Sequence, residues 1–226
     1  MKIGIIGNGF AAKAMCQLKC NGVDIITYGT NTDSPNLTLV DLINCEIIFI
    51  CVPETIGLEG PSNLDIIINI QIVLQQLSYS GFIVLRSVVP VGTSDKLKCY
   101  YMSEFLTEKN YIDDFINNKD WVFGYLGSNI EENKLFMVKI RTLINLSYGH
   151  LRIMHNNINL LSNKEAEMVN IFRIELLASK QAFCNKMYEY CSKMDVNYNN
   201  VISVATDDYS IKYMEVNPTP TPNPTQ

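Results

Sequence analysis

The sequence KIGIIGNGFAA, residues 2–12, decides the fold of this chain. Its first five residues form an apolar run typical of a buried strand, and Gly7-x-Gly9-x-x-Ala12 follows where a helix begins. In such a motif Gly7 permits a tight turn, Gly9 lets the backbone approach a pyrophosphate, and Ala12 allows the helix to pack closely on the strand. The helix N-terminus adds amide groups and partial positive charge. The alternative is a glycine turn that serves strand–helix packing alone.

Strand-like and helix-like patterns alternate after this turn. Apolar runs at 24–28, 45–52 and 81–86 predict strands, and the stretches 10–19 and 64–77 predict helices. Strands that are apolar throughout are typical of a sheet covered on both faces. The alternation therefore predicts an α/β fold, a Rossmann-like doubly wound parallel sheet.

The remaining chain is less regular and ends in a tail. The expected elements are a partly helical stretch 94–106, a strand 121–125, a helix 130–143, a final strand 151–155, a long helix 163–193 without Pro or Gly, and a short helix 199–206. We expect a dinucleotide-binding domain over residues 1–160, a central helical segment over 161–212, and a Pro/Thr-rich tail over 213–226 with little to bury.

Composition excludes several classes of function. The 18 basic and 23 acidic residues give a net charge of −5, which argues against nucleic acid or an anionic membrane as the main partner. Seven cysteines without C-x-x-C spacing and two histidines make a zinc site or a disulfide framework unexpected. No secretory signal opens the sequence and no apolar run is long enough to cross a bilayer. We expect a cytoplasmic protein without a metal.

One part of the usual dinucleotide site is missing. An acidic residue normally ends the second strand and accepts hydrogen bonds from the adenosine ribose. Here the strand 24–28 is followed by Gly29 and Thr30. No basic residue nearby suggests the phosphorylated cofactor, so NAD is the expected ligand. Loss of a charged hydrogen bond weakens its binding by about 1–3 kcal/mol.

Further motifs follow one another in the order of a known family. They are Cys51-Val52-Pro53, Gly60 with Leu64-Asp65, the octapeptide RSVVPVGT at 86–93, SEFLTE at 103–108, the helical stretch Glu165 to Asn185, and Asp207-Asp208. In these motifs the chain resembles the UDP-glucose/GDP-mannose dehydrogenase family, and UDP-glucose 6-dehydrogenases most closely. The resemblance implies an ultrashort member that lacks the C-terminal half and forms a homodimer through the 163–193 helix.

The resemblance implies an activity whose chemical groups are largely missing. The family oxidises a sugar 6-hydroxymethyl group twice, reduces two NAD, and uses a cysteine nucleophile for which no residue here is a match. The family's catalytic threonine, lysine and asparagine match Val88, Asn170 and Ile174. Only Glu104 and Glu108 remain as candidate catalytic residues. We therefore expect oxidation of UDP-glucose to be impaired or lost.

The resemblance also implies two sets of binding residues. Those expected to bind NAD are Gly7, Asn8, Gly9, Phe10, Ala11, Thr30, Cys51, Val52, Pro53, Ser87, Val88 and Glu108, and those expected to bind a UDP-sugar are Glu104, Phe105 and Leu106. Two alternatives stay open. One is a non-catalytic dimeric protein that binds a nucleotide or sugar nucleotide, or serves as a scaffold. The other is a working dehydrogenase of a different small substrate with Glu104 or Glu108 as its base.

Overall fold

The computed structural model describes residues 1–29, 38–52, 63–127 and 130–206. Thr30, Pro53, Gly60 and the tail 213–226, which the sequence singled out, lie outside these residues. The chain divides into two compact units, Met1–Asn170 and Ile171–Gln226. Each unit is described by itself.

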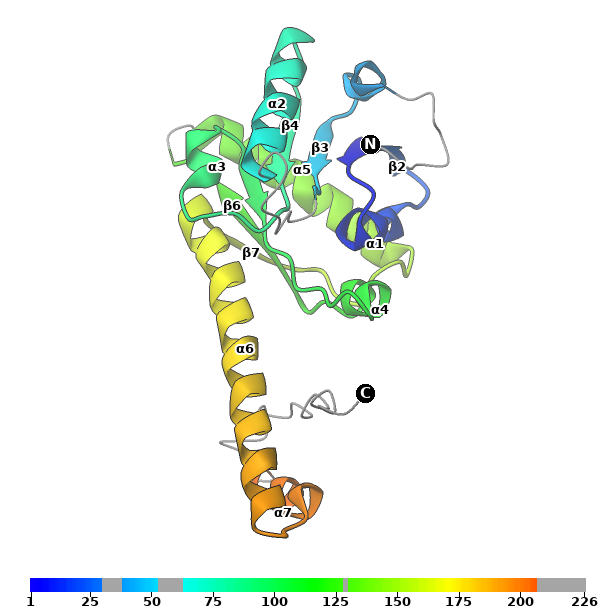
Figure 1. Ribbon diagram of the computed structural model, residues 1–226. Coiled ribbons are helices and arrows are strands. Elements are labelled where there is room, and N and C mark those ends of the chain that lie inside the picture. Colours follow the sequence, from blue (N-terminus) through cyan, green and yellow to red (C-terminus); the bar gives the residue numbers. More distant parts are fainter. Residues whose placement is uncertain (30–37, 53–62, 128–129, 207–226) are drawn as a thin grey trace. The chain divides into compact units, whose positions relative to one another are not determined.

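Seven strands of the first unit form one sheet (Figure 1). They are β1 (Lys2–Ile6), β2 (Asp24–Tyr28), β3 (Ile47–Ile50), β4 (Phe82–Leu85), β5 (Tyr100–Met102), β6 (Asp120–Tyr125) and β7 (Asn157–Ser162). Their order is β2-β1-β3-β4-β5-β6-β7. All described neighbours pair in parallel except β5 and β6, which are antiparallel. The predicted Rossmann-like fold is confirmed.

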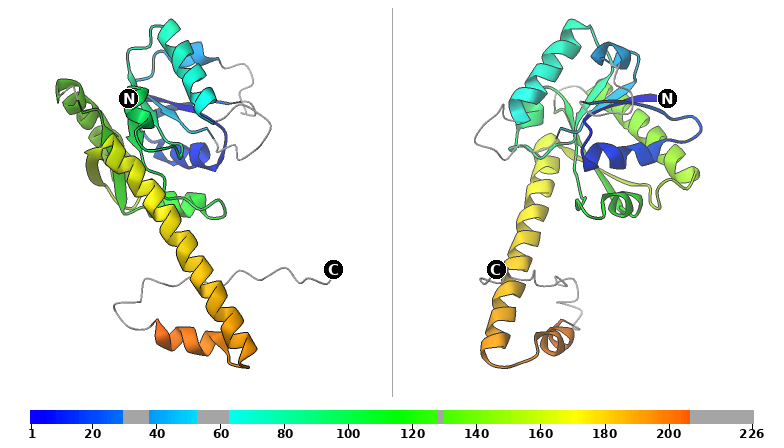
Figure 2. Two further views of the ribbon diagram at one scale, coloured as in Figure 1. Left: turned by 60° about the vertical axis from the view of Figure 1, so that its left-hand side comes forward. Right: turned by 45° about the vertical axis from the view of Figure 1, so that its right-hand side comes forward.

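Helices cover both faces of this sheet because alternate strand residues point to opposite sides. Ile3 and Ile5 of β1 pack with α1 (Phe10–Met15), the 3-10 helix η1 (Cys16–Leu18), α4 (Tyr111–Ile116) and α5 (Ile130–Gly149). Ile48 and Ile50 of β3 face the other side, with η2 (Leu39–Leu42) and α2 (Asn63–Gln76). Figure 2 shows α2 and α1 on opposite sides of the strands.

The polypeptide then continues into two helices. α6 (Asn163–Lys193) begins in the first unit and ends in the second, where α7 (Tyr198–Ala205) follows it. The bounds of α6 are those predicted for the long helix. In the second unit, Cys184 and Cys191 of α6 and Tyr198 of α7 are buried.

Two predicted elements differ in the structure. The stretch 94–106 contains only the short helix α3 (Thr93–Lys96) before β5, whose three residues are all buried, and residues 103–107 form a loop. Glu104 and Glu108 therefore do not share a helix face. The final strand was expected at 151–155 but lies at 157–162. Leu151 has a left-handed backbone (φ 57°), so the chain turns sharply after α5 before it can extend.

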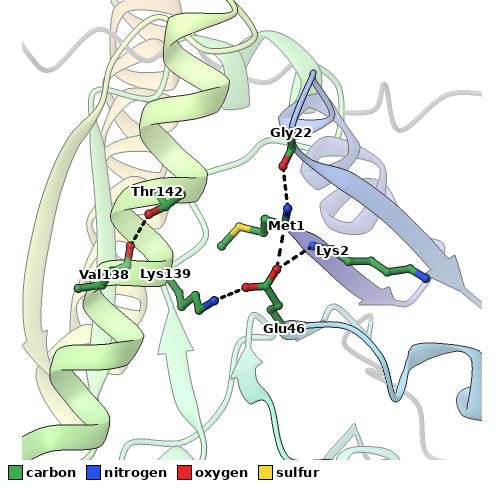
Figure 3. A network of polar contacts seen from close by, with 7 residues as sticks. All are labelled: Met1, Lys2, Gly22, Glu46, Val138, Lys139 and Thr142. Atoms are coloured by element: carbon green, nitrogen blue, oxygen red, sulfur yellow. Dashed lines mark hydrogen bonds and ion pairs between the residues drawn. The ribbon is translucent and has the colours of Figure 1, made fainter.

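A polar network fixes the amino ends of the strands (Figure 3). Glu46, which precedes β3, accepts a hydrogen bond from the Lys2 backbone N–H at 3.3 Å and a second one from the Lys139 ammonium of α5. The Met1 amine donates to the Gly22 carbonyl at 2.9 Å and lies 3.9 Å from the Glu46 carboxylate. The bond from Lys139 lowers the pKa of Glu46. The network lies at the sheet edge opposite to the glycine turn.

Candidate functional site

The predicted binding residues meet at the carboxyl edge of the parallel strands. Gly7 follows β1, Cys51 and Val52 follow β3, Ser87 follows β4, and Glu104 follows β5. These four strands are parallel neighbours, so the segments after them lie on the same edge. The strand order reverses between β1 and β3, and in open α/β sheets ligands bind at this switch point. The structure thus brings residues of four of the sequence motifs to the same edge of the sheet.

The fold itself requires Gly7. Its backbone has a φ of +131°, and a Cβ built on it would lie 2.1 Å from the Cys51 carbonyl oxygen. The Gly7 N–H donates to the Tyr28 carbonyl at 2.8 Å, and the Cys51 N–H donates to the Ile6 carbonyl at 2.7 Å. Packing by itself therefore requires glycine at position 7, whether or not a ligand binds.

Among the described residues, packing does not require a glycine at position 9. It precedes α1 with an ordinary backbone (φ −70°, ψ −178°), and a Cβ built on it would meet no described heavy atom within 4 Å. Glycine is conformationally costly where any residue would fit. A glycine that leaves open space at the start of a helix, at a switch point, is what close approach of a ligand requires.

Geometry explains why the ribose-binding acid is missing at position 29. A Cβ built on Gly29 would lie 3.2 Å from the carbonyl carbon and oxygen of Gly7 and from the Asn8 Cβ. The first two atoms belong to the backbone of the glycine turn, so they cannot rotate away as a side chain does. An acid at this position must displace the turn by a few tenths of an ångström.

The thiol at the carboxyl edge is poorly suited to nucleophilic chemistry. All seven cysteines are free, and burial raises the pKa of Cys51, at the carboxyl edge, to about 12. Burial also raises the pKa of Cys99 to about 12 and, to a smaller extent, the pKa of Cys16. A thiol with so high a pKa stays protonated near neutral pH, and the thiolate is the nucleophile.

A buried arginine stands beside Glu104, and sequence reasoning missed it. Arg86 is 2 % exposed, and its Nε lies 4.0 Å from the Glu104 carboxylate. The Nη1 of Arg86 donates to the Met102 sulfur at 3.0 Å, and the guanidinium lies 5.3 Å from the centre of the Phe115 ring. The available signal was a charged residue directly after the apolar run 82–85. This pairing places the Glu104 carboxyl group beside a buried guanidinium at the carboxyl edge.

The other predicted site residues are less uniformly placed. Phe105 and Leu106 are half-buried, and Glu108 is exposed in the turn that follows them. Val88 is half-buried after Ser87, and Ser87 is buried with its hydroxyl donating to the Val52 carbonyl at 2.8 Å. The Phe10 ring, at the start of α1, packs at 6.3 Å from that of Tyr111, and its neighbour Ala11 is half-buried.

The two α6 positions where the family has an ammonium and an amide differ here. Asn170 is 1 % exposed and its amide donates to the Tyr101 hydroxyl at 3.1 Å. Ile174, in the second unit, is 45 % exposed and has no polar atom in its side chain. An oxyanion stabiliser must present a donor to the reacting group. The described conformation of Asn170 directs its donor to a tyrosine instead.

The fold of the chain is similar to the folds of several dehydrogenases of known structure. The fold is similar to that of a UDP-glucose dehydrogenase from the hyperthermophilic archaeon Pyrobaculum islandicum, with 16% identity, a TM-score of 0.74, and coverage of 93% of this chain and 57% of that one. It is similar to a GDP-mannose dehydrogenase from Pseudomonas aeruginosa, with 17% identity, a TM-score of 0.73, and coverage of 94% and 58%. A 3-hydroxyisobutyrate dehydrogenase from Mycobacterium tuberculosis, at 10% identity, has a TM-score of 0.69 and coverage of 99% and 76%. The chain thus shares with these proteins a Rossmann-like fold followed by a long helix.

A family model matches the sequence of the helical segment. Residues 164–221 match the central domain of the UDP-glucose/GDP-mannose dehydrogenase family, which confirms the resemblance inferred from the motifs. No curated protein matches the chain. The chain spans less than three-fifths of the two nucleotide-sugar dehydrogenases to which its fold is similar. No helix in the described part is long and apolar enough to cross a membrane. The same residues contain no group of His, Cys, Asp and Glu that could hold a metal ion.

Proposed function

We propose that the carboxyl edge of the sheet binds NAD, and that the chain is a UDP-glucose 6-dehydrogenase-like protein with impaired or lost oxidation. The open space at Gly9 is the observation that carries the binding half. A turn that serves packing alone accounts for Gly7, whose Cβ would collide with Cys51, but it does not account for Gly9, whose Cβ would meet no atom of the described residues within 4 Å. The pyrophosphate is placed against the amides at the start of α1.

The second part of the proposal, impaired or lost oxidation, rests on the absence of a suitable nucleophile and of oxyanion donors. The only cysteine that follows a strand at this edge is protonated and buried, since the pKa of Cys51 is raised to about 12. The donor of Asn170 is engaged by Tyr101, and Ile174 is a hydrocarbon. Nucleophile and oxyanion donors each contribute factors of about 10²–10³ or more to such rates. Glu104 and Glu108 would remain to contact a UDP-sugar without a thiol to attack it.

A matched pair of glycine variants tests NAD binding. Gly9→Ala places a methyl group in the space assigned to the pyrophosphate and is expected to leave the fold intact. Overpacking by one methyl group costs about 1–3 kcal/mol, so the dissociation constant measured by calorimetry should rise about 5- to 150-fold. Gly149→Ala, at the end of α5, also meets no described atom within 4 Å and is the control. Equal affinity of both variants for NAD would contradict the assigned site.

Turnover is tested separately. With UDP-glucose and NAD at millimolar concentration, we expect no NADH absorbance above a protein-free control, because Cys51, the cysteine that follows a strand at the carboxyl edge, is buried and has a raised pKa. Glu108→Gln should leave this baseline unchanged. Steady NADH formation that Glu108→Gln abolishes would show that oxidation is not lost.

A second candidate function, a non-catalytic dimeric binding or scaffold protein, is favoured by the surface of the second unit. There Phe172, Phe183 and Tyr190 of α6 are 66%, 57% and 60% exposed. α6 and α7 also line an apolar cavity of about 470 Å³ within this unit. So much exposed apolar area is typical of an interface, and a second copy of the chain is the proposed partner. Light scattering should give the mass of a dimer, and Phe183→Asp should give that of a monomer. A monomeric wild-type chain at micromolar concentration would exclude this candidate.

A further inference from the structure

The first turns of α6 pack on the sheet through an unusually polar face. The buried residues of this stretch include Asn163, Ala166, Glu167 and Asn170, all between 0% and 1% exposed. Their spacing of three, four and seven residues places them on one side of a helix. Three of the four are polar, whereas a helix that docks on a sheet normally does so with apolar side chains. They form hydrogen bonds with the segment between β4 and β5, with Tyr101 of β5 and with Ser103 after β5, close to α3 (Figure 1).

Glu167 makes the strongest of these contacts. Its carboxylate accepts hydrogen bonds from the backbone N–H groups of Gly92 and of Ser94, the latter at 2.8 Å. Gly92 has a left-handed backbone (φ 88°), and the two N–H groups belong to the start of α3, where amides have no partner within a helix. Charge-assisted hydrogen bonds contribute more than neutral ones. The carboxylate therefore holds the end of the turn 90–93 to α6.

Asn170 reaches the beginning of the same segment through a chain of hydrogen bonds. Its amide donates to the Tyr101 hydroxyl at 3.1 Å, and that hydroxyl donates to the Ser87 carbonyl at 3.2 Å. The Ser87 hydroxyl in turn donates to the Val52 carbonyl at 2.8 Å. All members of this chain are buried. Ser87 and Val52 are two of the residues expected to bind the cofactor.

We propose that Glu167 and Asn170 are positioning residues that fix the segment 87–94 in the shape that the cofactor requires. This inference rests on the proposed NAD site. The segment begins at Ser87 on the carboxyl edge and ends at the N–H groups bound by Glu167, so α6 holds it at both ends. In its middle Val89 is buried and Thr93 donates two hydrogen bonds to the Pro90 carbonyl, whereas the side chains of Pro90 and Val91 are exposed. Without the α6 contacts the two ends of the segment are less restrained, and binding must then order them at a cost.

Three variants separate positioning from general stability. Glu167→Gln keeps the volume but replaces one acceptor oxygen by a donor, so one of the two N–H groups loses its partner. Tyr101→Phe breaks the chain between Asn170 and Ser87 with little change of volume. Ser103→Ala is the matched control, because the Ser103 hydroxyl donates to the Ala166 carbonyl at 2.8 Å and so joins α6 to the segment after β5 instead.

Two measurements on the full chain decide the matter. Hydrogen exchange without ligand should accelerate at least tenfold at Gly92 and Ser94 in Glu167→Gln, with β1 amides unchanged. NAD affinity measured by calorimetry should fall about tenfold in Glu167→Gln and in Tyr101→Phe, and stay within twofold in Ser103→Ala at a similar melting temperature. Should Glu167→Gln fail to fold, Tyr101→Phe still tests the affinity.

The outcomes are distinguishable. Unchanged exchange at Gly92 and Ser94 in Glu167→Gln overturns the inference. Faster exchange with unchanged NAD affinity overturns the positioning role, because the contacts then serve stability alone. If the wild-type chain binds no NAD, the proposed function fails, whereas faster exchange in the variant still supports the holding of the segment by α6.

Discussion

Gly124 lies in β6 where the strand passes the first residue of α6, and its replacement by alanine measures how closely the two are packed. A Cβ at position 124 would lie 2.6 Å from the Asn163 Oδ1 atom, 2.8 Å from the Asn163 Cα and 3.1 Å from the Tyr101 Cβ. Asn163 cannot rotate away freely, because its amide donates to the Asp95 carboxylate and to the Cys99 carbonyl, both at 2.9 Å. The start of α6 must therefore move.

The magnitude follows from these distances. Ordinary contact begins at 3.4 Å, so the new methyl group and the Asn163 oxygen must separate by roughly 0.8 Å. Overpacking of this kind costs about 1–3 kcal/mol, and loss of one Asn163 hydrogen bond adds about 1 kcal/mol. We expect a loss of about 2–4 kcal/mol in the free energy of unfolding. For a chain of this size that lowers the melting temperature by about 4–16 °C.

Urea unfolding monitored by circular dichroism, together with a thermal scan, provides the assay. Gly149→Ala again serves as the control, since its methyl group meets no described atom and should leave stability unchanged or raise it slightly. A Gly124→Ala protein within about 0.5 kcal/mol of wild type would refute the reasoning, because the contact between β6 and α6 would then be loose enough to absorb a methyl group.

Two further predictions concern titrating groups. Cys51 should resist a thiol reagent in the native protein at pH 8, while the half-buried Cys20 reacts, as read by mass spectrometry of the labelled peptides; rapid labelling of Cys51 would contradict a pKa of about 12. The folded-state pKa of Glu46 is lowered, so its contribution to stability is present above the unfolded value of about 4.3 and is lost as the pH falls through the folded value. Lys139→Met should remove part of this acid dependence, by less than about 1 kcal/mol because the pair is partly exposed to solvent. If the urea midpoint falls between pH 7 and pH 3 by the same amount in wild type and in Lys139→Met, the pair of Glu46 with Lys139 does not contribute to the acid dependence.

The sequence allowed prediction of the elements that rest on local pattern. β1, β2 and α6 have the predicted bounds, because uninterrupted apolar strands and a long stretch without Pro or Gly are patterns that tertiary contacts rarely override. The stretch 94–106 was misjudged because β5 has only three residues, too few for a period to show. The final strand was predicted too early in the sequence because the chain turns at Leu151, whose backbone is left-handed, and leucine is not a residue type that indicates a turn.

The candidate site was predictable only in part. The glycine turn was visible from residues 2–12, because a strand, a G-x-G-x-x-A motif and a helix pattern follow one another there and the backbone at Gly7 requires glycine. The pair of Arg86 with Glu104 and the contacts of Glu167 were not visible. Charged residues in a helix or after a strand usually indicate solvent exposure, and only the packing of distant segments buries Arg86 and Glu167 and partly buries Glu104. The role of Asn170 likewise depends on Tyr101, a partner 69 residues earlier in the chain.

The crowding around Gly29 also bears on how this chain can change over generations. The backbone of Gly7 occupies the space that a side chain at position 29 would need, and Gly7 is itself confined by the Cys51 carbonyl. A carboxylate introduced at position 29 by one substitution would therefore require the turn to adapt. A substitution that only added an acid there would act first on the backbone of the turn, and a carboxylate elsewhere on the same edge would avoid this crowding.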